Sequence, residues 1–186
     1  MNQSIDIIKN KFNELGCSDF SSPAVPKDIK TRISEFEREH NLRLPDDYKY
    51  FLENYGECNF EIDAVYKPTE KTPFVNSQGF QEISFFYGLG TENDLYKILE
   101  VYSQRIPTGY IPIADLPGGN LLCIDSNPNS SNYGKIYLWD HENECDGKLD
   151  NMYLVANSFS NFISSFEAEK KMDSEDDGIE DFHFDF

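Results

Sequence analysis

The residue types that could do chemistry in this chain are its histidines, its cysteines and its paired carboxylates, and their spacing favours no catalytic site. The three histidines are His40, His141 and His183, and none of the four cysteines belongs to a CxxC pair. Cys145 follows His141 by four residues, but because both are expected in a loop, that spacing implies no contact between thiol and imidazole. The sequence also contains no P-loop, GxGxxG or GxSxG motif. We therefore expect a protein that is not an enzyme, with no catalytic residue and no cofactor.

Asp115 and Asp125 are the carboxylate pair that could support general acid–base catalysis. They lie at the ends of two adjacent predicted strands, and the sequence leaves open whether the two side chains converge. An enzyme would need a pocket around them, with Asp140 and His141 as further polar groups. Turn-forming and capping roles are commoner for such aspartates, and a structural role is the interpretation that we favour.

The segment 140–147 carries carboxylates at alternate positions, as the first part of a calcium-binding loop does. An EF-hand would need glycine where Cys145 stands and a bidentate glutamate where Asn151 stands, so the segment departs from that pattern twice. We therefore expect no metal site and interpret the segment as a solvated acidic loop. Three of its side chains are candidate contacts for a protein partner: Glu142, Glu144 and Asp146.

The composition excludes several classes of partner. Asp and Glu total 34 against 16 Lys and Arg, which gives a net charge of −18 and an isoelectric point near 4.4. A chain so acidic repels phosphate backbones and anionic membrane surfaces, so we expect it to bind neither nucleic acid nor membrane. It attracts basic proteins, and a basic protein domain is the partner that its charge favours.

The N-terminal segment and the cysteines favour the cytoplasm. Residues 1–16 lack the apolar stretch of a signal peptide, and no part of the chain approaches the roughly 20 apolar residues of a membrane span. The four cysteines are widely and irregularly spaced in a chain of 186 residues, which favours free thiols in a reducing compartment over a disulfide framework.

Hydrophobic periodicity predicts an α+β fold, in which N-terminal helices pack on a mainly antiparallel β-sheet and a C-terminal helix closes the domain. Apolar residues recur three and four positions apart in the segments expected to be helical, which are 3–15, 27–40, 45–55, 92–104 and 159–166. Runs of large apolar residues bounded by turn residues mark the expected strands, which are 59–66, 81–87, 110–115, 120–125, 135–140 and 152–156.

The composition changes near the C-terminus and divides the chain into a domain, residues 1–168, and a tail, residues 169–186. Residues 173–186 contain seven acidic side chains and no lysine or arginine, and they are expected to be disordered when free. Aromatic residues alternate with the acidic ones, and this composition suits binding to a partner. Two alternatives stay open: the tail only keeps the protein soluble, or its aromatic residues pack on the domain itself. The binding candidates in it are Asp176, Asp177, Glu180, Asp181, Phe182 and Phe184.

Several short motifs are individually weak but occur in an order that is specific as a set. They are residues 33–37, 44–52, 55–56, 111–115, 118–120, 123–125, 134–141 and 154–159, with Phe162 after them. In this order they resemble the SUKH superfamily, which contains the fungal Smi/Knr regulators of cell-wall synthesis and many bacterial immunity proteins. The resemblance covers roughly residues 25–166. The sequence departs from the family in a longer Pro-rich loop near residues 67–79 and in the acidic tail.

The motif residues are fold-keeping features and do not amount to an active site. The resemblance implies structural roles for Leu44, Pro45, Tyr48, Phe51, Leu52, Gly118, Gly119, Asn120, Asp125, Tyr137, Trp139, Asp140, His141, Phe159 and Phe162. The Gly-Gly turn admits positive φ, and Asn120 tolerates it too. Trp139 is expected to anchor the core, and Asp140 with His141 to end a strand.

The resemblance also implies a function in protein binding. In bacteria it implies an immunity protein, an antitoxin that binds and blocks a polymorphic toxin, often a nuclease; in fungi it implies a scaffold or regulator without a toxin partner. We favour the immunity hypothesis, because a nuclease must be basic to hold nucleic acid and an acidic inhibitor can occupy the same surface. Beside the acidic loop and the tail, the candidate contacts are Glu57, Glu61 and Asp63.

Overall fold

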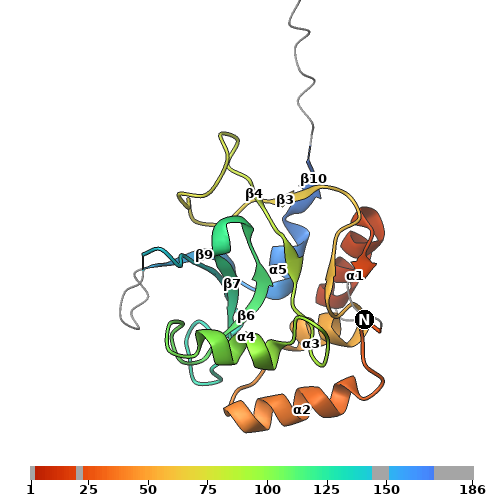
Figure 1. Cartoon of the computed structure of the whole chain (residues 1–186). Coiled ribbons are helices and arrows are strands. Elements are labelled where there is room, and N and C mark those ends of the chain that lie inside the picture. Colours follow the sequence, from red (N-terminus) through yellow and green to blue (C-terminus); the bar gives the residue numbers. More distant parts are fainter. Residues whose placement is uncertain (1–2, 20–22, 144–150, 170–186) are drawn as a thin grey trace, which may run out of the picture.

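The computed structural model of the protein describes residues 3–19, 23–143 and 151–169. These residues form helices and two β-sheets in the α+β arrangement that the sequence predicts, with most of the helices first and one helix after the last strand of the larger sheet (Figure 1). The helices are α1 (Gln3–Leu15), α2 (Ile29–His40), α3 (Asp46–Asn54), α4 (Leu95–Tyr102) and α5 (Phe159–Ser164). The predicted fold class is therefore confirmed.

Capping residues explain where several helices begin. Pro45 is the extended N-cap of α3, and because proline fixes φ, it sets the chain direction at the first turn. The Asp94 carboxylate accepts a hydrogen bond from the backbone N–H of Tyr96 (2.7 Å) at the start of α4. The Ser158 hydroxyl accepts one from the N–H of Asn161 (3.1 Å) at the start of α5. Each of these bonds satisfies an amide that the helix itself leaves unpaired.

The larger sheet is antiparallel, with the strand order β1-β2-β5-β6-β7-β8-β9. Its strands are β1 (Ser18–Asp19), β2 (Cys58–Asn59), β5 (Phe85–Phe86), β6 (Tyr110–Asp115), β7 (Leu121–Asp125), β8 (Ile136–Trp139) and β9 (Met152–Ala156). Pro112 lies within the central strand β6, where a proline would normally break the hydrogen-bond ladder. It is tolerated because the register of β6 and β7 shifts between Pro112 and Ala114.

A smaller antiparallel sheet has the order β10-β3-β4, formed by β3 (Ala64–Tyr66), β4 (Gln81–Glu82) and β10 (Phe166–Ala168). Here the structure differs from the expected strands, since each of the segments 59–66 and 81–87 is divided between the two sheets. β10 also takes up the end of the segment expected to be helical. Its Phe166 pairs with Tyr66 on β3, and the two rings lie 5.4 Å apart, so aromatic burial favours a strand there.

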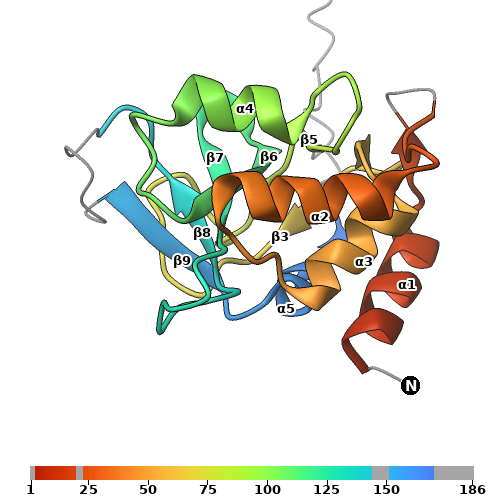
Figure 2. The ribbon, with the colours of Figure 1, turned by 90° about the horizontal axis from the view of Figure 1, so that it is seen from below.

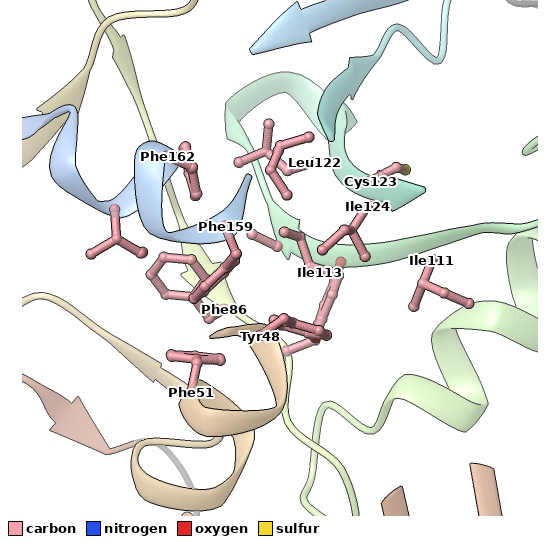
Figure 3. Packing of buried hydrophobic residues seen from close by; sticks show 14 of the residues in the cluster. Tyr48, Phe51, Phe86, Ile111, Ile113, Leu122, Cys123, Ile124, Phe159 and Phe162 are labelled. Atoms are coloured by element: carbon pink, nitrogen blue, oxygen red, sulfur yellow. The ribbon is translucent and has the colours of Figure 1, made fainter. Parts of the chain in front are cut away.

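The core lies between the central strands and the helices, and aromatic rings fill much of it (Figure 3). Phe86 on β5 lies at its centre, with ring centroids 5.0 Å from Phe51 on α3 and 6.3 Å from Phe159 on α5. All three side chains are fully buried. On the other face of the sheet, Tyr102 of α4 packs edge-on against Trp139 of β8, at 5.6 Å. The sheet is thus covered by α5 on one face and by α4 on the other (Figure 2).

Candidate partner-binding surface

Two of the predicted acidic contacts, Glu61 and Asp63, lie exposed on the turn between β2 and β3. This turn lines a hollow of about 280 Å³ together with Glu82 on β4 and Glu169 after β10. The backbone N–H of Glu169 donates to the carbonyl of Asp63 (2.8 Å), which fixes the end of β10 beside the turn. The smaller sheet therefore brings four carboxylates to one hollow, and no basic residue is among the described residues that line it.

Ile62, between these two acids, adds an apolar side chain to the hollow. It is 43 % exposed and is one of three large apolar side chains that the described part of the chain exposes, with Phe74 and Val101. An apolar side chain ringed by charged ones has the arrangement of a protein interface, in which a desolvated centre is surrounded by a polar rim. Sequence reasoning did not single out Ile62, although an isoleucine flanked by two acids in a turn is a visible signal.

The sequence also did not predict Glu82 and Glu169 as part of this surface, and no local sequence pattern marks them. They reach the hollow only because β4 and β10 pair with opposite edges of β3. Pairing between segments so distant in sequence is decided by the packing of the whole domain. We call Glu61, Ile62, Asp63, Glu82 and Glu169 together the acidic hollow.

Glu57, the third contact predicted in this region, does not lie at the surface, and the structure contradicts that prediction. Its side chain is fully buried, and its carboxylate accepts hydrogen bonds from the backbone N–H (2.8 Å) and the side-chain amide (2.7 Å) of Asn93. A buried carboxylate must be hydrogen-bonded to be tolerated, and this one uses its oxygens to hold the loop that precedes α4. A partner could reach it only if that loop opened.

Glu142 lies exposed at the start of the acidic loop between β8 and β9. The neighbouring Asp140 is only 1 % exposed, and its carboxylate accepts bonds from the Glu142 N–H (3.0 Å) and the Asn143 side-chain amide (2.7 Å). Asp140 therefore fixes the direction in which the loop leaves the sheet. Glu144 and Asp146 lie outside the described residues.

Asn120 and His141 fasten the turn between β6 and β7 to the end of β8. The Asn120 side-chain oxygen accepts from the His141 backbone N–H (3.1 Å) and lies 3.0 Å from Nδ1 of its ring. Gly118 and Gly119 have φ of 82° and 84°, in the left-handed region that glycine occupies without strain. Asn120 itself is extended, with φ of −73°, so its tolerance of positive φ is not what the turn uses.

Arg105 covers the same end of the sheet from outside. Its guanidinium lies over the rings of Trp139 (5.0 Å) and Tyr102 (5.6 Å), and it donates to the carbonyl of His141 at 3.4 Å. A cation over aromatic faces is attracted by the ring quadrupole, and stacking of this kind keeps a side chain in place. Trp139, expected to anchor the core, is fully buried beneath it.

The other family-signature side chains lie mostly inside the domain. The fully buried ones are Leu44, Tyr48, Phe51, Leu52, Phe159 and Phe162, and Pro45 is buried at the start of α3. Tyr137 is half-buried, with its ring 5.6 Å from that of Tyr110. These positions leave the signature little surface with which to contact a partner.

Asp115 and Asp125 do not converge. In the pairing of β6 with β7, Asp115 lies opposite Leu121 and Asp125 lies opposite Tyr110, so the two aspartates occupy opposite ends of the hairpin. Four residues of strand correspond to about 13 Å at roughly 3.3 Å per residue. Asp125 instead accepts a hydrogen bond from the backbone N–H of Asn127 (3.0 Å) and shapes the following turn. The pair therefore offers no general acid–base site.

The remaining chemistry-bearing groups give no site in the described part of the chain. Cys58 and Cys123 are both buried, and burial raises the pKa of the Cys123 thiol, which suppresses its reactive thiolate. No group of three or more metal-binding side chains occurs among the described residues. None of the described helices combines the length and the apolar character that crossing a bilayer requires.

Cys145, His183 and the binding candidates of the tail lie outside the described residues. Those tail residues are Asp176, Asp177, Glu180, Asp181, Phe182 and Phe184. Their role as contacts stays a prediction from the sequence.

Comparison with known proteins identifies relatives that match most of the chain. The family model described as the SMI1 / KNR4 family (SUKH-1) matches residues 30–165, from α2 to the end of α5. The chain is 36 % identical over 184 residues to the SPbeta prophage-derived uncharacterized protein YokK of Bacillus subtilis (strain 168). This alignment covers 92 % of this chain and 91 % of the relative. The chain is 30 % identical over 152 residues to the immunity protein RhsIB of Dickeya dadantii (strain 3937), covering 78 % of this chain and 83 % of the relative.

Proposed function

Because the chain belongs to the SMI1 / KNR4 family (SUKH-1), we propose that it is an immunity protein, which binds a cognate toxin and neutralises it by direct protein–protein contact. The observation that carries the proposal is the 30 % identity to an immunity protein over 78 % of this chain. That alignment is long enough to include most of the fold. We place the complex in the cytoplasm, where thiols such as those of Cys58 and Cys123 stay reduced.

The arrangement of polar groups supports binding over catalysis. The side-chain oxygens of Asp125, Asp140 and Asn120 accept hydrogen bonds from neighbouring donors within the fold. General acid–base work would need two such groups converging on an open pocket, and Asp115 and Asp125 lie at opposite ends of a hairpin instead. We therefore propose a protein without enzymatic activity.

The charge of the molecule supports a basic toxin as the partner. A net charge of −18 accelerates encounter with a basic protein, and the acidic hollow offers carboxylates around the exposed side chain of Ile62. Close charge pairs across such interfaces can couple by about 1.5–7 kcal/mol. A nuclease toxin fits this chemistry, because the surface with which it holds nucleic acid must be basic. We propose that Glu61 and Asp63, with Glu142 and the acidic tail, contribute to the contact.

Affinity capture from the source cells followed by reconstitution tests the proposal. The full-length protein and a version ending at Met172 serve as baits at low and at high salt. We expect one dominant basic partner, whose purified activity is abolished by an equimolar amount of the full-length protein. Several partners that retain their activities in the complex would contradict neutralisation and would indicate a regulatory scaffold instead.

A set of charge-neutralising substitutions locates the contact. Glu61→Gln combined with Asp63→Asn should weaken the purified complex at least about tenfold, since each lost charge pair is worth a kcal/mol or more. Glu35→Gln combined with Glu100→Gln is the matched control, because both side chains are exposed on helices away from the hollow. Equal affinities for the two double variants would exclude the acidic hollow while leaving inhibition itself intact.

A further inference from the structure

The outer strand β9 is an edge whose own residues include neither the charges nor the prolines that commonly prevent pairing with another chain. The other edges are short and carry a charge: β1 is Ser18–Asp19, β4 is Gln81–Glu82, and β10 ends in Glu167 and Ala168. β9, Met152–Ala156, is longer and contains no charged residue and no proline. Long uncharged edge strands present a row of unpaired backbone groups and promote edge-to-edge association.

In this structure another part of the chain covers that edge. The loop of residues 67–80 leaves β3, and its first part runs beside β9 (Figure 2). The backbone N–H groups of Thr69 and Glu70 donate to the carbonyls of Val155 and Leu154, each at 2.9 Å. The Thr69 hydroxyl donates to the same Val155 carbonyl (2.8 Å). The Glu70 carboxylate accepts from the Leu154 N–H (2.9 Å). We call residues 67–72 the strap.

The rest of the loop holds the strap in a defined position. Thr72 is 2 % exposed, and its hydroxyl lies 3.4 Å from the side-chain oxygen of the buried Gln81 on β4. Beyond it, the Asn76 side chain accepts from the backbone N–H groups of Gln78 (2.9 Å) and Phe80 (3.0 Å), which closes a tight turn.

We infer that the strap guards β9 against antiparallel pairing with the β9 strand of a second copy of this chain. A second copy is the occupant that fits, because two identical strands related by a two-fold axis satisfy each other's backbone groups along a single self-complementary edge. The side chains of β9, Met-Tyr-Leu-Val-Ala, favour a strand and provide no like-charge repulsion between the copies. The Pro-rich loop thus keeps separate copies apart, independently of any toxin.

The test compares the oligomeric state of strap variants by sedimentation velocity over a range of concentrations. Thr69→Val with Glu70→Ala removes the two side-chain bonds, and Thr69→Pro with Glu70→Ala also removes the Thr69 backbone donor. We expect both to shift from the wild-type mass towards twice that mass as concentration rises, with faster hydrogen exchange at the Leu154 amide. Lys71→Ala, at the next and exposed position, should keep the wild-type mass.

A rescue variant separates edge pairing from other association. Adding Tyr153→Lys to the strap variants places a charge on β9 and should return the mass to that of the wild type. A wild-type mass for both folded strap variants would overturn the inference, as would association that Tyr153→Lys leaves unchanged. If the proline variant fails to fold by circular dichroism, the Thr69→Val and Glu70→Ala variant decides, because it leaves the backbone donors in place.

Discussion

At the scale of single residues, burial separates the carboxylates that hold this fold from those available to a partner. Glu57 and Glu61 are four residues apart, yet Glu57 is fully buried against Asn93 while Glu61 is exposed as part of the acidic hollow. In a chain with 34 acidic residues, the sequence pattern around each of them is too similar to tell these roles apart. The distinction depends on which loop folds over the side chain, and that is a property of the tertiary structure.

Replacing Glu57 measures the first of these roles. We expect Glu57→Ala to lower the free energy of unfolding by about 2–3 kcal/mol, because the amide groups of Asn93 would lose a charged acceptor inside the protein. Glu57→Gln keeps one acceptor oxygen and should cost less. Urea denaturation of both variants measures these changes. Glu61→Ala is the exposed control, and its free energy of unfolding should lie within about 0.5 kcal/mol of that of the wild type. Equal midpoints for Glu57→Ala and Glu61→Ala would contradict the buried role.

Asp140 gives a second prediction at this scale. Asp140→Ala removes the acceptor for the Glu142 N–H and the Asn143 amide, so we expect about 1–3 kcal/mol of lost stability and faster hydrogen exchange at residue 142. Thermal unfolding and hydrogen exchange measure the two effects. A variant of unchanged stability and unchanged exchange would show that Asp140 does not fasten the acidic loop.

At the scale of elements, the hydrophobic pattern predicts long elements well and short paired strands poorly. β6 and β9 coincide with their expected ranges because both are runs of mainly apolar residues, and α1 coincides with its own because it carries a regular helical period. The segments 59–66 and 81–87 read as single strands, although the chain changes sheet within both. The change is set by Tyr66 and Phe166 packing with Phe162, at ring distances of 5.1 and 5.0 Å, and these contacts join distant parts of the sequence.

The N-cap of α5 tests how far that helix depends on local signals. Ser158→Ala removes the hydroxyl that accepts from the Asn161 N–H and should cost about 1 kcal/mol. Ser164→Ala is the matched control in the last turn, where the hydroxyl donates to the Asn161 carbonyl without capping an orphan amide. Chemical denaturation of both variants provides the comparison. If Ser164→Ala lost as much stability as Ser158→Ala, the loss of the N-cap hydrogen bond would not explain the effect of Ser158→Ala.

At the scale of the whole molecule, the negative charge favours a basic partner, and the fold determines where acidic side chains gather on the surface. The family and the negative charge could be predicted from the sequence, but the acidic hollow could not, since Glu82 and Glu169 join Glu61 and Asp63 only through the smaller sheet. We expect the association rate with the toxin to fall at least tenfold between about 50 and 500 mM salt, because electrostatic steering is screened. Stopped-flow mixing of the purified pair measures that rate. A rate independent of salt would contradict a charge-guided encounter.

The most direct test of the immunity function is growth protection in cells. The captured partner is expressed from an inducible promoter with this protein, with its Glu61→Gln and Asp63→Asn variant, or with an empty vector. We expect growth arrest with the empty vector, full growth with the wild-type protein and reduced protection with the variant. Arrest that persists despite a folded and abundant wild-type protein would contradict neutralisation, and growth with the empty vector would show that the partner is no toxin.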